Sequence, residues 1–197
     1  TEDMKLEPLT DYSKFKGDCE KVLNSYSTDD FITTTLRPST VCGYAKRQRL
    51  DLVVNILTNH AFNKSEISIF GGEQLRPNIN IKDMCNSYLH IMNSEDKLIN
   101  GEAFNVGFEN YSIKYLADLV SSCFNKEIKI KVVHSDDNRS YHISSEKIKS
   151  KLNFKTLYTI KNGIEDLKNA LTNNLLIDSL ENELYFNIKR MNSLKLK

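Results

Sequence analysis

The sequence has little glycine: seven residues among 197, and no three of them stand in the GxGxxG spacing of a dinucleotide-binding turn. The phosphate-binding P-loop pattern is also missing. Both patterns need glycine because the backbone must approach a phosphate group closely. We therefore expect no glycine-built phosphate cradle within these residues.

Long apolar runs are missing as well. No stretch approaches the roughly 18 to 20 apolar residues that a membrane helix needs, so we expect a soluble protein with no membrane partner. The first residues lack the basic start, apolar stretch and cleavage site of a signal peptide, so we expect a cytoplasmic protein. The four cysteines stand far apart without a CxxC pair, which predicts reduced thiols and neither a disulfide framework nor a metal site.

The sequence has no excess of basic or acidic residues. Lys and Arg total 27 against 26 acidic residues, which gives a formal net charge of +1. Nucleic-acid-binding proteins normally carry a strong basic excess, so we expect no nucleic-acid partner. Hydrophobic residues at 40% and charged residues at 27% are ordinary for a globular chain and argue against disorder.

Strand and helix patterns alternate along the chain, which predicts an α/β fold. Apolar residues at helical spacing predict helices over residues 12–26, 50–62, 82–92, 113–124, 145–152 and 157–175. Apolar and β-branched runs predict strands over residues 31–36, 67–70, 79–81, 103–106 and 128–133. The tail from residue 177 onward is more polar, and we expect its last residues to fray.

Tyr12 and Lys16 form a candidate acid–base pair. They stand four residues apart near the start of the first predicted helix, so their side chains share one helical face. An ammonium group beside a phenol favours the phenolate, which suits removal of a proton from a sugar or alcohol hydroxyl. The same spacing recurs at Tyr185 and Lys189, so spacing alone leaves a purely structural role open.

The segments around this pair are more specific. Residues 8–20, PLTDYSKFKGDCE, resemble the active-site helix of extended short-chain dehydrogenases, the family that contains NAD-dependent nucleotide-sugar epimerases and dehydratases. Four further segments resemble that family in its own order: LRPSTVCG at 36–43, RLDLVVN at 49–55, IFGGEQLRP with IKD within 69–83, and NRSY with KI and LNF within 138–154. Together the five segments cover nearly all of the chain.

The resemblance implies acid–base chemistry coupled to hydride transfer. Tyr12 would deprotonate a sugar hydroxyl while hydride leaves the same carbon for NAD, with NADP not excluded. Lys16 would hold the nicotinamide ribose, and the backbone around Pro38 and Ser39 would border the nicotinamide. The substrate would be a nucleotide sugar in polysaccharide biosynthesis, and the complete enzyme would be a homodimer.

The resemblance also implies a set of substrate-binding residues. Thr40 stands where many relatives carry a substrate-binding asparagine, and it keeps a hydroxyl in place of the amide. Arg49 and Leu50 would lie near the diphosphate and the nucleotide. Arg76 would clamp the diphosphate, for which a two-pronged guanidinium suits better than an ammonium group. Arg139 would contribute from the last matching segment, although an ordinary solvated charge is the alternative there.

In fold terms, the resemblance implies the remainder of a Rossmann-type doubly wound sheet, with its amino-terminal half absent, plus a smaller α/β substrate-binding domain. Residues 1–43 and 82–107 would form the Rossmann side with the Tyr–Lys helix. Residues 44–81 and 108–197 would form the substrate-binding portion and the carboxy-terminal tail.

Two hypotheses about function follow. The family's glycine turn and its triad Ser or Thr precede the Tyr–Lys helix, and these residues do not contain them. The chain is then either the carboxy-terminal part of an NAD-dependent nucleotide-sugar epimerase or dehydratase, or a non-catalytic truncated homologue that binds a sugar nucleotide or a partner chain. Epimerase, dehydratase and reductase stay open, because the residues that separate them lie upstream.

Overall fold

The structure is a computed structural model that describes residues 1–134 and 140–195. Its helices are α1 (Asp11–Ser25), α2 (Val53–Lys64), α3 (Ile81–Met92), α4 (Asp96–Ile99), α5 (Ile113–Ser122), α6 (Glu146–Leu152), α7 (Ile160–Thr172) and α8 (Asn187–Ser193), with a 3-10 turn η1 (Glu183–Tyr185). Its strands are β1 (Thr34–Pro38), β2 (Thr40–Cys42), β3 (Glu66–Phe70), β4 (Leu75–Asn80), β5 (Glu102–Val106), β6 (Glu109–Ser112) and β7 (Lys129–Val133). None of the described helices is long and apolar enough to cross a bilayer.

The described strands form three small sheets. β1 pairs in parallel with β5, and β3 pairs in parallel with β7. In the third sheet, β4 lies between β2, which is parallel to it, and β6, which is antiparallel. Parallel strands joined through helices confirm the α/β class that the alternating sequence pattern predicts.

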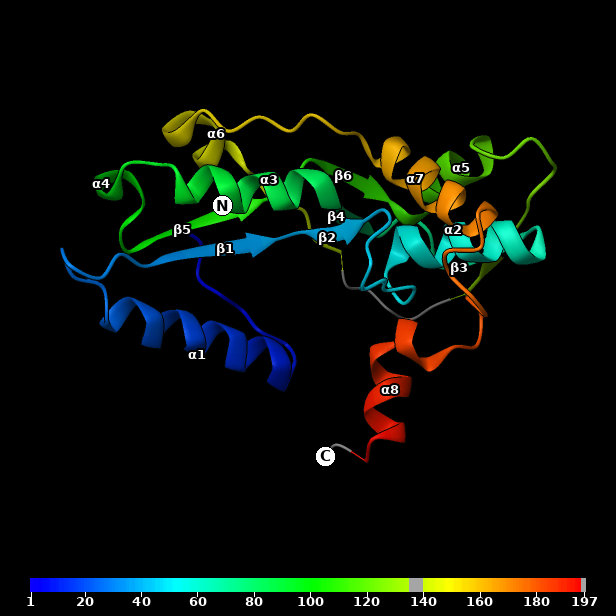
Figure 1. The fold of residues 1–197 in the computed structure, drawn as a ribbon, viewed down its shortest axis with the longest axis horizontal. Coiled ribbons are helices and arrows are strands. Elements are labelled where there is room, and N and C mark those ends of the chain that lie inside the picture. The colour runs from blue at the N-terminus through cyan, green and yellow to red at the C-terminus, as the bar shows by residue number, and fades with distance from the viewer. Residues whose placement is uncertain (135–139, 196–197) are drawn as a thin grey trace.

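Helices cover both sides of the β1–β5 pair (Figure 1). α1 lies on one side and runs antiparallel to β1, whereas α3 and α6 lie on the other. The apolar side chains of α3 and α6 pack with Phe104 and Val106 of β5 in one buried cluster. α6 therefore packs on the β1–β5 sheet. The division into a Rossmann side and a substrate-binding portion stays a prediction.

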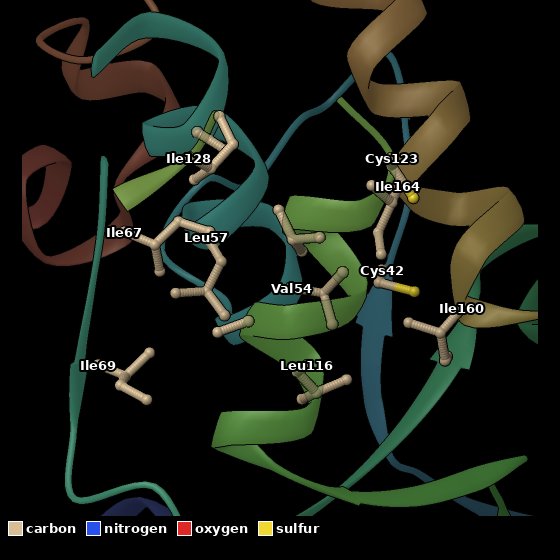
Figure 2. Packing of buried hydrophobic residues seen from close by; sticks show 13 residues of the cluster. Cys42, Val54, Leu57, Ile67, Ile69, Leu116, Cys123, Ile128, Ile160 and Ile164 are labelled. Atoms are coloured by element: carbon tan, nitrogen blue, oxygen red, sulfur yellow. The ribbon is translucent and has the colours of Figure 1, made fainter. Parts of the chain in front are cut away.

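The largest described core lies at the other end of the molecule, where α2 and α5 lie between β3 on one side and α7 on the other (Figure 2). Side chains from these helices meet around the buried thiol of Cys42, at the end of β2. A smaller cluster joins Leu50 to α7 and to the tail. The fully buried members of the largest core are Ala61, Ile67, Leu116, Ala117, Val120, Ile160 and Ile164.

Several boundaries differ from the sequence prediction. β1 begins at Thr34 and ends on Pro38, whereas the apolar run predicted a strand over residues 31–36. Phe31 is 57% exposed, so its aromatic character does not place it in the sheet. β2, β6 and α4 were not predicted, because their few residues carry no clear periodicity. The more polar tail forms η1 and α8, neither of which was predicted.

Candidate active site

α1 begins at a capping box that fixes the position of the candidate acid–base pair. The Thr10 hydroxyl oxygen accepts from the Ser13 N–H at 3.2 Å, and the Ser13 hydroxyl oxygen accepts from the Thr10 N–H at 3.0 Å. Because the helix starts directly after Thr10, Tyr12 and Lys16 lie on successive turns, as the sequence predicts.

The side chains of this pair project from the helix into open space. Tyr12 is 75% exposed, and Lys16 is exposed as well. Within residues 1–134 and 140–195, neither side chain makes a hydrogen bond to another residue. Both polar groups are therefore accessible to a ligand that approaches α1.

An ion pair attaches α1 to the sheet. Arg37 of β1 donates to Glu20 of α1 through Nε at 3.0 Å and through Nη2 at 2.6 Å. Both side chains are about a fifth exposed, and the hydrogen bond to Glu20 raises the pKa of Arg37. Because side chains alternate along a strand, Arg37 faces α1 while Leu36 packs in the cluster on the other side.

The direction of the helix decides where Tyr12 lies relative to the strand. α1 runs antiparallel to β1, so the turn that carries Tyr12 lies at the carboxyl end of the strand (Figure 1). Sequence reasoning did not identify the contact between Arg37 and Glu20. The sequence offered one signal. Glu20 follows Lys16 by four residues, so both side chains lie on the same broad side of the helix, the side expected to face the site.

Pro38, Ser39 and Thr40 occupy the carboxyl end of β1, where the chain passes into β2. In open α/β sheets, ligands bind outside the carboxyl ends of the strands. Pro38 is exposed, and the Ser39 N–H donates to Val106 O at 2.9 Å. The Ser39 hydroxyl is buried and has no hydrogen-bond partner in the described part of the chain. It is a polar atom that a ligand at this edge could satisfy.

The loop after β2 is held by buried amides. Gln48 is 2% exposed, and its side-chain nitrogen donates to Gly43 O at 3.2 Å and to Arg49 O at 3.0 Å. Asn55 of α2 accepts from the Gly43 N–H at 3.0 Å and donates to Arg49 O at 2.9 Å. The backbone of Arg49 is thereby fixed before any ligand binds.

Arg49 and Leu50 are adjacent in sequence and point to different surroundings. Arg49 pairs with Asp51 and lines a cavity of about 120 Å³ together with Val41, the neighbour of Thr40. Leu50 is fully buried, in the cluster that it forms with α7 and the tail. Its side chain is thus directed into the core and away from the cavity.

Arg76 lies in β4, one strand away from Thr40. β2 and β4 pair in parallel with Thr40 opposite Asn78, so Arg76 and Thr40 belong to the same sheet. The Arg76 guanidinium lies 5.6 Å from the centre of the Tyr141 ring and donates from Nη1 to Leu75 O at 2.9 Å. Arg139, the remaining predicted substrate residue, lies outside the described residues.

A larger cavity, of about 370 Å³, lies beside the segment that carries Arg76. It is formed by α2, β3 and the start of α5, and Gln74 contributes to its lining. Its walls are mostly apolar, with His60 and Lys64 among the polar groups. Burial lowers the pKa of His60, and the charge of Lys64 adds to that effect. A planar, mostly apolar group with a few polar atoms suits such a cavity.

The structure thus places the predicted residues on separate elements, with Arg49 and Leu50 in the loop before α2. Tyr12 and Lys16 lie on α1, Pro38, Ser39 and Thr40 lie at the strand end, and Arg76 lies on the sheet that Thr40 begins. Among the residues that the structure describes, no three His, Cys, Asp or Glu side chains are placed to hold a metal ion.

Comparison with known proteins identifies the class. The sequence profile of the NAD dependent epimerase/dehydratase family matches residues 1–107, which is more than half of the chain. The chain therefore belongs to the NAD dependent epimerase/dehydratase family, as its sequence segments predict.

Solved structures share the fold of this chain. A dTDP-glucose 4,6-dehydratase from Bacillus anthracis in complex with NAD is 20% identical, with a TM-score of 0.76 over 92% of this chain. A UDP-glucuronic acid 4-epimerase from Bacillus cereus in complex with UDP-glucuronic acid and NAD is 22% identical, with a TM-score of 0.75 over 88% of this chain. RMD from Pseudomonas aeruginosa in complex with NADPH is 16% identical, with a TM-score of 0.78 over 88% of this chain.

The match covers only part of each of these structures. This chain spans 58% of the dehydratase, 56% of the epimerase and 60% of RMD. The likeness confirms the Rossmann-type α/β fold that the sequence predicts.

Proposed function

We propose that this chain supplies the Tyr–Lys helix and the sugar-nucleotide surface of an NAD-dependent enzyme that epimerises or dehydrates a nucleotide sugar. The observation that carries the proposal is the exposed pair Tyr12 and Lys16, held at the carboxyl edge of β1 by the Arg37–Glu20 ion pair. Membership of the family and the complexes of similar proteins with NAD or NADPH support the choice of cofactor.

The residues present fit one end of NAD. The ammonium group of Lys16 suits a ribose hydroxyl, and the exposed backbone at Pro38 with the unpartnered hydroxyl of Ser39 suits the polar edge of a nicotinamide. When bound, the cofactor supplies the hydride acceptor. These 197 residues contain no glycine-rich turn, so we assign them no contact with the pyrophosphate.

Tyr12 is the proposed acid–base group. As the phenolate, its oxygen would take the proton of the sugar hydroxyl on the carbon that gives up the hydride. Nothing else in the described chain hydrogen-bonds the phenol, so its partner in the complex would be the substrate.

The substrate would lie between the loop of Arg49 and the strand of Arg76. The Arg76 guanidinium matches two oxygens of a diphosphate. Arg49 pairs with Asp51 through Nε and Nη2 and would add a contact through its remaining N–H groups, and Thr40 would add a hydroxyl contact to the sugar. The cavity of about 370 Å³ beside Gln74 would take the base of the nucleotide. Arg139 remains a proposed additional contact. Such an enzyme would work in the cytoplasm, in polysaccharide biosynthesis.

The second hypothesis, a module that binds a partner chain, is favoured by one specific observation. α1 has no buried residue, and Phe15, Val22 and Tyr26 line an apolar hollow along its outer side. Apolar surface of this extent normally contacts another chain or another part of the same protein. We propose that this side of α1 is covered in the working protein, and that the complete enzyme is a homodimer.

The test of the catalytic role is Tyr12→Phe in the full-length protein. We expect turnover to fall by about 10² to 10⁴-fold, because one positioned acid–base group is lost, while NAD affinity stays close to that of the parent. The matched control is Tyr26→Phe, which removes the same atom from the other end of the same helix. Equal turnover in the two variants would exclude Tyr12 from the reaction and favour the binding module.

The test of the substrate surface is Arg76→Ala beside Arg76→Lys. Loss of a charge-assisted pair with a diphosphate costs roughly 1.5 to 3 kcal/mol, or about ten- to a hundredfold in affinity. We expect calorimetry to show that loss for the sugar nucleotide and not for NAD, with partial recovery in Arg76→Lys. A similar loss for both ligands would show that Arg76 acts on the fold as a whole.

A further inference from the structure

Asp51 joins two segments that lie far apart in the sequence. Its carboxylate accepts from Arg49 Nε at 2.9 Å and Nη2 at 3.1 Å, and from the backbone N–H of Asn187 at 3.0 Å. Burial raises the pKa of Asp51, but the hydrogen bonds from Arg49 and Asn187 outweigh burial and lower it below its usual value. The carboxylate therefore stays charged while it holds the guanidinium of Arg49 against the first turn of α8.

The same two segments meet at a second point. The Leu50 N–H donates to Tyr185 O at 2.9 Å. Tyr185 and Phe186 pack on the buried cluster that contains Leu50 and Leu167. Residues 183–193, named here the clasp, are thus anchored by apolar packing and not by Asp51 alone.

We propose that Asp51 is a positioning residue, and that the clasp sets the direction of the Arg49 guanidinium and so the affinity of the protein for a nucleoside diphosphate. The inference rests on the proposed function, which makes Arg49 a diphosphate contact. Asp51 occupies the Nε and Nη2 atoms of Arg49, and in the described chain the side chain makes no other hydrogen bond. A guanidinium that is fixed before the ligand arrives loses less rotamer freedom on binding, which strengthens binding.

The matched pair of variants is Asn187→Pro and Asn187→Ala. Asn187 is the first residue of α8, where proline is well tolerated because its N–H has no partner within the helix. The preceding residue, Phe186, has extended backbone angles, which a following proline favours. Both variants lose the side-chain contact of Asn187 with Arg47, and only Asn187→Pro loses the N–H that reaches Asp51.

Two readouts on the full-length protein separate the inference from the proposed function. The first is calorimetric titration with UDP, dTDP, GDP and ADP, with NAD as the control ligand. The second is the rate at which trypsin cleaves after Arg47 and Arg49, which reports the order of the loop without any ligand. Relative to Asn187→Ala, we expect Asn187→Pro to bind the preferred diphosphate about three- to tenfold more weakly and to be cleaved faster, with unchanged NAD affinity.

Two substitutions of Asp51 itself provide a further test, because one removes the charge and the other keeps it. We expect Asp51→Asn to weaken diphosphate binding about tenfold, and Asp51→Glu to recover part of the loss because it keeps the charge. A merely structural role would predict equal losses for NAD and no recovery.

Each outcome decides between the two claims. Equal affinities and equal cleavage rates in Asn187→Pro and Asn187→Ala would overturn the inference alone. Failure of the parent to bind any of the four diphosphates would overturn the proposed function, and the affinity claim with it.

Discussion

α1 and α7 both begin with a capping box, but α1 lies on the surface and α7 packs in the core. Thr10 caps α1 and Thr159 caps α7, and each takes part in a complete capping box. None of the 15 residues of α1 is buried, whereas six of the 13 residues of α7 are buried. The local signals that start a helix therefore say nothing about whether its side chains serve packing or chemistry.

The difference shows where stability and the proposed chemistry reside. α7 packs on α2 and on the strands around Cys42, so its residues hold the core together. α1 carries Tyr12 and Lys16 and is attached to the described chain chiefly by the Arg37–Glu20 ion pair. Substitutions in α7 should therefore change the free energy of unfolding, and substitutions in α1 should change binding and turnover.

The largest expected effect on stability is that of Leu167→Ala in α7. Leu167 is fully buried, and truncation of a buried leucine costs about 2–5 kcal/mol because it removes contacts and leaves a cavity. Val22→Ala in α1, where Val22 is 59% exposed, should change the free energy of unfolding by no more than about 0.5 kcal/mol. Chemical denaturation of both variants measures the difference. A large cost for Val22→Ala in residues 1–197 alone would break the comparison. In the complete enzyme, such a cost is what the proposed cover over this side of α1 predicts.

The two helices also differ in how much space surrounds their glycine residues. A Cβ at Gly163 of α7 would lie 2.9 Å from the Cys42 sulfur, whereas a Cβ at Gly17 of α1 would meet nothing closer than 3.5 Å. Gly163→Ala should destabilise the protein by about 1–3 kcal/mol through overpacking. Gly17→Ala should stabilise it by about 0.5–1 kcal/mol, because alanine favours the helix.

A double variant sharpens this prediction. Cys42→Ala removes the atom that the new methyl group would strike, so Gly163→Ala should cost less in that background. A coupling energy of about 0.5 kcal/mol or more, measured by a double-mutant cycle, is the expected result. Strict additivity would mean that the helix shifts as a whole, and that close packing at Cys42 does not limit residue 163.

Much of the fold was predictable from the sequence because its signals are local. The start of α1, the helical pattern of α3 and the apolar strand β5 lie where the residues place them. β2 and β6 are three and four residues long, and they form because β4 provides a partner on each side. Such short strands depend on tertiary pairing, which no local pattern contains.

The candidate site was predictable only in part, for the same reason. The spacing of Tyr12 and Lys16 and the resemblance of the surrounding segments identify the helix. The ion pair between Glu20 and Arg37 forms only when α1 packs beside β1, and no local pattern in the sequence predicts that packing. The contact between Asp51 and Asn187 joins residues 136 positions apart. Asp51 lies in the RLDLVVN segment, but Asn187 lies in none of the five segments, so the sequence does not pair the two residues.

The attachment of α1 gives the next prediction. Glu20→Gln leaves the shape of the side chain and removes its charge, so Arg37 keeps a partner without an ion pair. We expect a loss of about 1 kcal/mol in the free energy of unfolding, since a partly buried charge-assisted pair is weakened. We also expect turnover to fall, because the direction of α1 sets the position of Tyr12.

The control for this variant is Asp18→Asn on the same helix. Asp18 pairs with Lys21 at 2.8 Å, but both side chains are largely exposed, so the pair contributes little. Asp18→Asn should leave both stability and turnover unchanged. Comparable losses in the two variants would indicate that the overall charge of α1, and not its attachment to β1, controls its position.

The smallest expected effect concerns α6, which is attached to the sheet by both packing and charge. Ile148 and Leu152 are buried, and Glu102 of β5 pairs with Lys147 at 2.8 Å and with Lys151. The hydrogen bonds from Lys147 and Lys151 lower the pKa of Glu102 below its usual value. The folded state thus favours the charged carboxylate, and its contribution to stability is present above the unfolded pKa and lost as pH falls through the folded pKa.

Thermal unfolding of the parent and Glu102→Gln between about pH 7 and pH 3 tests this sign. The parent should be slightly more stable near neutral pH, and its advantage should shrink below about pH 4.5, near the ordinary pKa of a glutamic acid. The effect should be modest because water reaches all three side chains. If the parent has no advantage at any pH, the packing of Ile148 and Leu152 holds α6 on the sheet without help from the ion pairs.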